Sequence, residues 1–156
     1  MPSNSPLATS KSIQQRTGPT FHLATRVLPR RIRHATYVLY AFFRIADDVV
    51  DTTADVDPAA QRAELERIRE EALGRVEPSE PVLEAFQELK VDHDIPDEEV
   101  DLFIDAMLSD IDHEPFEDYR GVESYMRGSA VAVGNMMVAI MDVDRPERAK
   151  PHAAAL

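Results

Sequence analysis

The spacing of apolar residues along the chain predicts an all-α protein. In the segment 97–112 the apolar positions recur at i, i+3, i+4, i+7, i+8 and i+11, which places them on one face of a helix. These positions are Val100, Phe103, Ile104, Met107, Leu108 and Ile111. The sequence has no pair of alternating strand-like runs joined by a two-residue turn, and it has no internal repeat of about 20–50 residues.

Proline, glycine and aspartate positions divide the chain into separate helices. Pro29 suits a first helical turn, and the residues after it contain neither Gly nor Pro as far as Asp51. Asp57 and Pro58 form a cap and first-turn pair, and Gly74 stands where the next helix should end. The expected helices therefore cover 30–51, 59–73, 82–89, about 97–112 and about 122–141.

The two ends of the chain lack such patterns. Residues 1–12 are polar, contain two prolines and are expected to be disordered. The residues after Met141 form a tail rich in Pro and Ala. The whole chain, 1–156, is expected to form a single partial domain, because its length suits one domain or part of a larger one.

The polar residues of the segment 30–51 gather on one side of the predicted helix. At about 100° per residue they fall within a sector of about 100°, and apolar side chains cover nearly all the rest of the circumference. Such a helix belongs in a protein interior, so its polar stripe is expected to line an enclosed cavity. The stripe consists of Tyr37, Tyr40, Arg44, Asp47, Asp48 and Asp51.

The three aspartates at the end of this stripe predict a divalent cation. Asp47 and Asp51 are four residues apart and therefore lie one turn apart on the same face, with Asp48 beside them. Carboxylate oxygens favour Mg²⁺, with Mn²⁺ as a substitute, and Arg44 can bind an aspartate or a diphosphate oxygen. An acidic helix end in an acidic protein is the alternative interpretation. Acids near a helix C-terminus oppose the helix dipole, however, which favours a bound cation.

Composition and charge exclude several classes of function. The formal net charge is −12, from 17 basic and 29 acidic residues, so a general nucleic-acid binder is not expected. The absence of Cys excludes disulfides and thiolate chemistry. The sequence has neither a secretory signal nor an apolar run long enough to span a membrane, which favours a cytoplasmic protein. With three Lys and 15 Asp, the composition is typical of a halophilic surface.

The charge is unevenly distributed along the chain. Residues 1–51 carry seven basic and three acidic residues, whereas residues 52–156 carry ten basic and 26 acidic residues. Arg30, Arg31 and Arg33 supply much of the early positive charge. They are interpreted either as a solvated first helical turn or as groups that steer diphosphates or contact anionic lipid.

Three blocks of sequence resemble the phytoene and squalene synthase family. Their order and spacing agree with that family over about 10–141, and in detail they are similar to archaeal phytoene synthases. The blocks are Thr20-Phe21-His22-Leu23-Ala24 with Val27-Leu28-Pro29, then Tyr37-Val-Leu-Tyr-Ala-Phe-Phe-Arg-Ile-Ala-Asp-Asp-Val-Val-Asp51, then Tyr125-Met-Arg-Gly-Ser-Ala-Val-Ala-Val-Gly134 preceded by Asp105-Ala-Met-x-x-Asp110.

The resemblance implies the isoprenoid synthase helical bundle and a head-to-head condensation of two prenyl diphosphates. Two molecules of geranylgeranyl diphosphate would give a cyclopropyl diphosphate and then phytoene, without NADPH. A squalene or dehydrosqualene synthase acting on farnesyl diphosphate is the alternative, and squalene formation would need NADPH. By resemblance the catalytic residues are Tyr40, Arg44, Asp47 and Asp51, the metal ligands are Asp47, Asp48 and Asp51, and the substrate contacts are Thr20, Phe21, Tyr37 and Tyr125.

The sequence departs from the family pattern in three respects. Gly18-Pro19-Thr20-Phe21 stands where relatives tend to have a serine- or lysine-containing approach to the diphosphate, which leaves Thr20 as the aligned hydroxyl. Val131 stands where many relatives have Gly. The family's second aspartate-rich helix has no counterpart in 1–156, so the chain resembles the first half of the enzyme. We therefore expect this chain alone to be inactive or nearly so, and a second-half chain or subunit to complete the site.

Two further functions remain open. A head-to-tail chain-elongating prenyl transferase also presents D-D-x-x-D, although the position of Arg44 and the block 125–134 argue against it. A non-catalytic helical module that binds isoprenoids or a partner subunit gains support from the missing second half. A lipid product is also compatible with peripheral contact with a membrane.

Overall fold

Every regular element in the described part of the chain is a helix, which confirms the all-α prediction. The computed structural model describes residues 5–51 and 56–155. The elements are α1 (Pro6–Thr17), α2 (Pro19–Thr25), α3 (Arg30–Asp51), α4 (Pro58–Ala72), α5 (Pro81–Asp92), α6 (Asp97–Asp112), α7 (Tyr119–Met126), the π-helix η1 (Arg127–Val131), α8 (Ala132–Ile140) and α9 (Pro146–Ala154).

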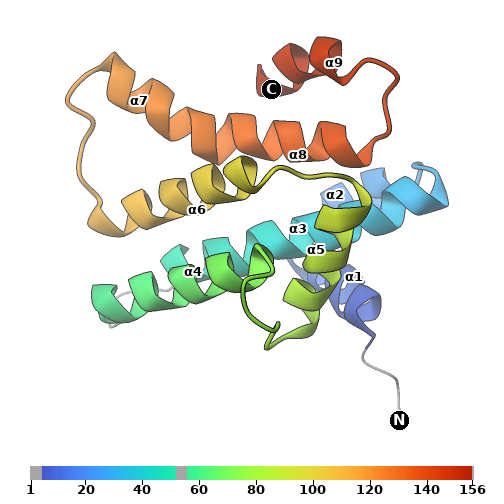
Figure 1. Cartoon of the computed structure of the whole chain (residues 1–156), viewed down its shortest axis with the longest axis horizontal. Coiled ribbons are helices and arrows are strands. Elements are labelled where there is room, and N and C mark those ends of the chain that lie inside the picture. Colours follow the sequence, from blue (N-terminus) through green and yellow to red (C-terminus); the bar gives the residue numbers. More distant parts are fainter. Residues whose placement is uncertain (1–4, 52–55, 156) are drawn as a thin grey trace.

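Helix α3 is the central element of the fold. It contacts α1, α4, α5, α6 and α8, and Figure 1 shows it crossing the molecule below the layer of α6 to α8. Leu39, Phe42 and Ala46 on its inner side are fully buried. The Phe42 ring stacks on Phe86 of α5 with 3.9 Å between centroids, and it also lies against Phe103 of α6. Burial of each such large apolar side chain contributes about 1.5–3 kcal/mol to stability.

The predicted helix boundaries are confirmed where the capping signals are strong. Helices α3 and α6 have the expected bounds. At the start of α4, Asp57 Oδ1 accepts a hydrogen bond from the Ala59 N–H at 3.0 Å. After α4, Gly74 has φ of +74°, the left-handed conformation that commonly ends a helix and that only glycine adopts without strain.

The helix predicted over about 122–141 exists but is not a regular α-helix. It starts earlier, at Tyr119, and its central turn, η1, is a π-helix. The buried Glu99 of α6 bonds to both η1 and α8. Arg127 Nη1 and Nη2 of η1 donate to its two carboxylate oxygens at 2.9 and 3.0 Å, and Asn135 Nδ2 of α8 donates to one of them at 3.0 Å. A buried carboxylate is tolerated there because both its oxygens are satisfied by these donors.

One expectation about the ends of the chain is wrong, and one helix near the C-terminus was not predicted. Residues 6–12 are not disordered but belong to α1, which packs against α3 and α5. Ser5 caps this helix. Ser10 and Gln14 are buried, and their side chains are satisfied because Ser10 Oγ donates to the Pro6 carbonyl oxygen and Gln14 Nε2 donates to Thr25 Oγ1. Residues 1–4 lie outside the described residues. The tail after Met141 includes helix α9, which packs on α8 and covers Gly134.

The contact between α6 and η1 depends on the absence of a side chain at Gly128. A Cβ at this position would overlap the Leu102 carbonyl oxygen and lie 2.9 Å from Ala106 Cβ. The Leu102 oxygen is a backbone atom and the Ala106 Cβ is bonded directly to the backbone of α6, so neither atom can rotate away.

We expect Gly128→Ala to destabilise the chain by about 1–3 kcal/mol, through overpacking. Gly121→Ala is the matched control, since its Cβ would meet nothing nearer than 3.5 Å, and in α7 it should stabilise by about 0.5–1 kcal/mol. Urea unfolding followed by circular dichroism measures both. Equal effects of the two substitutions would contradict the proposed close contact.

Candidate active site

Three residues of the polar stripe of α3, Tyr40, Arg44 and Asp47, line a cleft that is open to solvent, whereas Tyr37, Asp48 and Asp51 are not among its lining residues. The cleft has a volume of about 380 Å³ and lies between α3, α6 and the α7–η1–α8 segment. The expectation of an enclosed cavity is therefore wrong for the described part of the chain. The lining residues are Tyr40, Phe43, Arg44, Asp47, Phe103, Met107, Asp110, Tyr125, Ser129 and Val133.

Arg44 is bonded to two of the three predicted aspartates. Its Nη1 donates to Asp47 Oδ2 at 2.9 Å, and its Nη2 lies 2.7 Å from Asp48 Oδ1. The spacings of three and four residues bring all three groups to one side of α3. Arg44 Nε is buried and has no partner in the described part of the chain. The guanidinium is thus fixed in direction by two carboxylates, with one donor still unused.

Asp47 is held in an environment that disfavours its charge. Burial raises the pKa of Asp47 above its ordinary value, and repulsion from Asp51 raises it further, while Arg44 opposes the shift. The negative charges of Asp48 and Asp110 add to the repulsion. A cation placed among these carboxylates would relieve the repulsion, so the pKa shift is consistent with a cation site.

The three aspartates differ in exposure and do not form a complete metal site by themselves. Asp47 is partly buried, Asp48 is more exposed at 54% of its side chain, and Asp51 is exposed. Among residues 5–51 and 56–155, no group of three His, Cys, Asp or Glu side chains is arranged to hold a metal ion. The donor set of Asp47 and Asp51 still suits a hard cation that takes its other ligands from water and substrate.

Tyr40 is positioned by the turn between α1 and α2. Its hydroxyl lies 3.1 Å from Thr17 Oγ1, and its ring stacks on Phe21 with 5.4 Å between centroids. A Cβ on Gly18 would lie 2.5 Å from the Tyr40 hydroxyl oxygen. Gly18 belongs to the segment 18–21 that departs from the family pattern. Because it has no side chain, the turn can lie directly against Tyr40.

The other predicted substrate contacts are not all in the cleft. Tyr125 lines it, whereas Tyr37 is buried beside His22 and His34, with which its ring stacks. Phe21 reaches the site through Tyr40 and is 41% exposed. Thr20 is exposed and is not among the residues that line the cleft.

Asp110 is a site residue that the sequence reasoning did not select. It faces Asp47 across the cleft from α6, and its Oδ2 accepts a hydrogen bond from the Tyr125 hydroxyl at 3.1 Å. Burial raises the pKa of Tyr125, and so does its bond to Asp110, so the phenol stays protonated at neutral pH. The signal was available, because the segment from Asp105 to Asp110 belongs to a block that resembles the family. Asp105 turns away and pairs with Arg69 at 2.5 Å.

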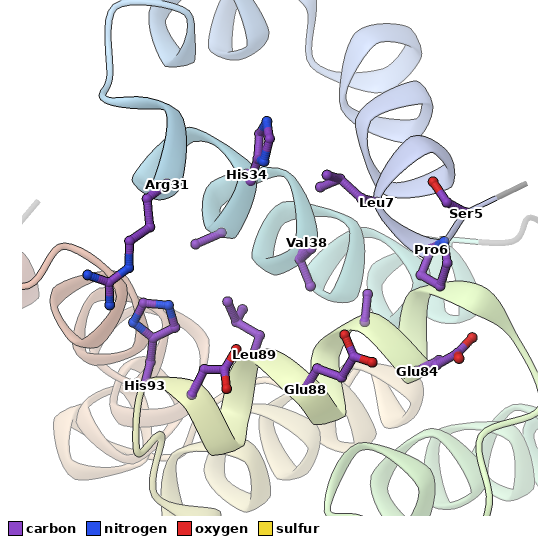
Figure 2. Close-up of a pocket in the computed structure, with 13 residues that line it drawn as sticks. Ser5, Pro6, Leu7, Arg31, His34, Val38, Glu84, Glu88, Leu89 and His93 are labelled. Atoms are coloured by element: carbon purple, nitrogen blue, oxygen red, sulfur yellow. The ribbon is translucent and has the colours of Figure 1, made fainter.

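A larger hollow than the cleft lies elsewhere, between α1, α3 and α5. Its volume is about 690 Å³, and Figure 2 shows Leu7, Val38 and Leu89 inside a rim that includes Arg31 and Glu88. None of the predicted site residues lines it. No helix of the described chain is long and apolar enough to cross a membrane.

Comparison with known proteins identifies the class of fold. The chain superposes on a crystal structure of a dehydrosqualene synthase with a TM-score of 0.79 and 26% sequence identity, covering 96% of this chain and 53% of that one. The fold is therefore that of the all-α isoprenoid synthases.

The sequence comparisons identify the family. The family model for squalene/phytoene synthase matches residues 14–156. The phytoene synthase of Rhodobacter capsulatus is 35% identical over 135 residues, which cover 85% of this chain and 40% of that protein. The presqualene diphosphate synthase of Rhodopseudomonas palustris is 35% identical over 127 residues, covering 79% and 44%. The chain belongs to the squalene/phytoene synthase family, and it spans less than half the length of these two relatives.

The raised pKa of Asp47 predicts how the stability of the metal-free chain depends on pH. Because the folded-state pKa is raised, ionised Asp47 lowers stability at pH values above that pKa, and the cost vanishes at acid pH, where the group is protonated in both states. We expect Asp47→Asn to raise the melting temperature slightly at pH 7 and to have less effect as the pH falls toward 4.

Thermal unfolding in EDTA between pH 4 and 7 measures this difference. Asp144→Asn, at an exposed position in the turn before α9, is the matched control. A melting temperature that falls at pH 7 in Asp47→Asn would mean that the ion pair with Arg44 outweighs burial and repulsion.

Proposed function

We propose that this chain carries the first half of a catalytic site for head-to-head condensation of two prenyl diphosphates. The observation that carries the proposal is the cleft in which Arg44, Asp47, Asp110 and Tyr125 meet above an apolar lining. Family membership supports this reaction class. Geranylgeranyl diphosphate as substrate and phytoene as product are proposed from the matched phytoene synthase, with farnesyl diphosphate and a squalene-type product as the alternative suggested by the presqualene diphosphate synthase.

Asp47 and Asp51 would hold Mg²⁺ or Mn²⁺, with Asp48 held beside them by Arg44. The donor oxygens, their repulsion and the partial burial of Asp47 fit a hard divalent cation. When bound, the metal would supply charge neutralisation for the departing diphosphate. No NADPH is required if the product is phytoene.

The chain's own residues would bind the leaving group and keep water from the reacting carbons. Arg44 lines the cleft and is held in a fixed direction by Asp47 and Asp48, which suits a guanidinium that binds a diphosphate oxygen. The Tyr40 hydroxyl, anchored on Thr17, can donate to the same group. Phe43, Phe103 and Val133 form apolar walls, against which an allylic chain would be shielded from solvent.

The open side of the cleft fits a site that is completed by further carboxylates. Asp47, Asp48 and Asp51 are all partly or fully solvent-exposed, so a second acidic helix, from a second-half chain or subunit, could approach them. We propose that the isolated chain binds Mg²⁺ and prenyl diphosphate but turns over little or no substrate. Peripheral membrane contact and a cytoplasmic location are part of the same proposal.

We expect a thiolodiphosphate analogue of geranylgeranyl diphosphate with Mg²⁺ to raise the melting temperature of the 156-residue chain. A hundredfold excess over Kd stabilises by about 2.7 kcal/mol, which for a chain of this size corresponds to roughly 5–10 °C. Arg44→Gln and Asp47→Asn should each weaken binding about tenfold or more, through loss of charge-assisted contacts. Asp144→Asn is the control for the change of charge.

The result that contradicts the proposal is an equal stabilisation with Mg²⁺ and with EDTA. Stabilisation by a partner protein, with none from Mg²⁺ and the analogue, would instead favour the non-catalytic helical module. Product analysis after addition of geranylgeranyl diphosphate separates head-to-head from head-to-tail condensation. Robust turnover by the chain alone would refute the proposal that further carboxylates are needed to complete the site.

A further inference from the structure

The basic end of the chain forms a hollow that contains no carboxylate. This hollow of about 550 Å³ lies between α1, α2 and α3, and none of its ten lining residues is acidic. Four other hollows on the described surface each have at least one acidic residue in their lining. Three cations line it: Lys11 of α1, Arg26 at the end of α2, and Arg33 of α3.

These three cations gather around one hollow in a chain that has a large excess of acid. Several other arginines do pair with carboxylates, as Arg67 does with Glu64, Glu71 and Glu80, and Arg127 with Glu99. Within residues 5–51 and 56–155, Lys11, Arg26 and Arg33 have no ion pair with a carboxylate. Three like charges around one hollow repel one another unless an anion lies between them.

The walls of the hollow are already ordered. Arg33 Nη1 donates to the Arg26 carbonyl oxygen at 3.3 Å, which ties the end of α2 to α3. His22 Nδ1 lies 2.8 Å from Gln14 Oε1, and its Nε2 lies 3.4 Å from Gln15 Nε2. An amide oxygen accepts and an amide nitrogen donates, so the neutral tautomer with hydrogen on Nδ1 satisfies both contacts. His22 is thus a wall of the hollow, stacked on Tyr37, and the ligand-binding charge comes from the three cations.

His34, which also lines the hollow, has a pKa that is lowered in part by the nearby positive charges. Burial lowers the pKa of His34, and the charges of Arg30, Arg33 and Lys11 lower it further. The imidazole is therefore neutral at pH 7 and can contribute one hydrogen bond to an anion without adding charge.

We propose that the hollow between α1, α2 and α3 is a metal-independent binding site for a phosphate or diphosphate group, held by Lys11, Arg26 and Arg33. Guanidinium groups suit phosphate oxygens because their donors bind two oxygens at once. The site is distinct from the cleft with Arg44 and Asp47, with which it shares no lining residue. Its ligand contributes the negative charge itself, so no divalent cation is needed.

Two sources of such a group are compatible with the surroundings. One is a soluble diphosphate, including that of a prenyl diphosphate. The other is the headgroup of an anionic lipid, since Leu23 and Val27 beside Arg26 are 62% and 86% exposed and such apolar side chains can enter a membrane interface.

Isothermal titration of the 156-residue chain with inorganic diphosphate in EDTA tests the first source. Co-sedimentation with vesicles of phosphatidylglycerol, against vesicles of phosphatidylcholine, tests the second. EDTA excludes the metal-dependent cleft, so failure here and failure of the proposed catalytic function are separate results. Binding of either probe supports the site, and the positive arm identifies the source.

Substitution of the lining cations locates the binding. Arg26→Gln and Lys11→Gln should each weaken binding about tenfold, because each removes a charge-assisted contact. Lys11 is exposed and no described contact depends on it, so its loss leaves the fold intact. Arg30→Gln is the matched control, because this substitution removes the same charge nearby, at a residue that does not line the hollow.

Three results would overturn the proposal. One is that neither inorganic diphosphate nor phosphatidylglycerol vesicles bind in EDTA. Another is that Arg30→Gln weakens binding as much as Arg26→Gln, which would mean a diffuse attraction to the basic end of the chain. The third is that Arg44→Gln removes the binding in EDTA, which would place the anion in the other cleft.

Discussion

The structure depends on the burial of one face of α3. Leu39, Phe42 and Ala46 are inaccessible to solvent, and the stacking of Phe42 on Phe86 fixes the rotation of α3 about its own axis. Once that rotation is set, the 3.6-residue period determines where every other side chain of α3 points. Tyr40, Arg44 and Asp47 are thereby directed into one cleft, and Arg33 and Tyr37 line the basic hollow near the start of the helix.

The charges of the two sites are arranged in opposite ways along this helix. In the cleft, carboxylates outnumber the single arginine, so a cation improves the electrostatics. In the basic hollow the cations have no carboxylate, so an anion does the same. Both sites draw on the first 51 residues: the cations of the hollow precede Asp47 in the sequence, and Asp110 of α6 adds a second carboxylate to the cleft. A diphosphate has different partners at the two places: metal and arginine at one, arginine and lysine at the other.

The fold was predictable where local signals were strong. Prolines at first turns, the Asp57 cap, Gly74 and the 3.6-residue period of 97–112 each reflect short-range physics. The corresponding helices α3, α4 and α6 begin and end within one residue of the expected bounds. Helix α1 was missed because its stability comes from packing against α3 and α5 and from the burial of Gln14, none of which gives an apolar period. Helix α9 was missed because Pro151 inside it is a helix-breaking signal in the sequence.

The candidate site was predictable in its residues but not in its enclosure. Tyr40, Arg44, Asp47 and Tyr125 meet in one cleft, as the shared helix face and the sequence blocks indicated. Tyr37 is on the same stripe, yet α2 covers it through His22. Asp110 enters the cleft from α6, and its approach to Asp47 depends on tertiary packing that no spacing within one helix reports. The role of these residues in binding metal and substrate stays a prediction.

The π-turn η1, Arg127–Val131, sets the rotation of the side chains of α8 about the helix axis relative to those of α7. A π-turn accommodates one residue more than an α-turn, which shifts the following side chains by roughly 100° around the axis. On one side of it Tyr125 reaches Asp110, and on the other Asn135 reaches Glu99. Loss of a single residue from this turn would leave both halves helical but would direct only one of these two side chains toward α6.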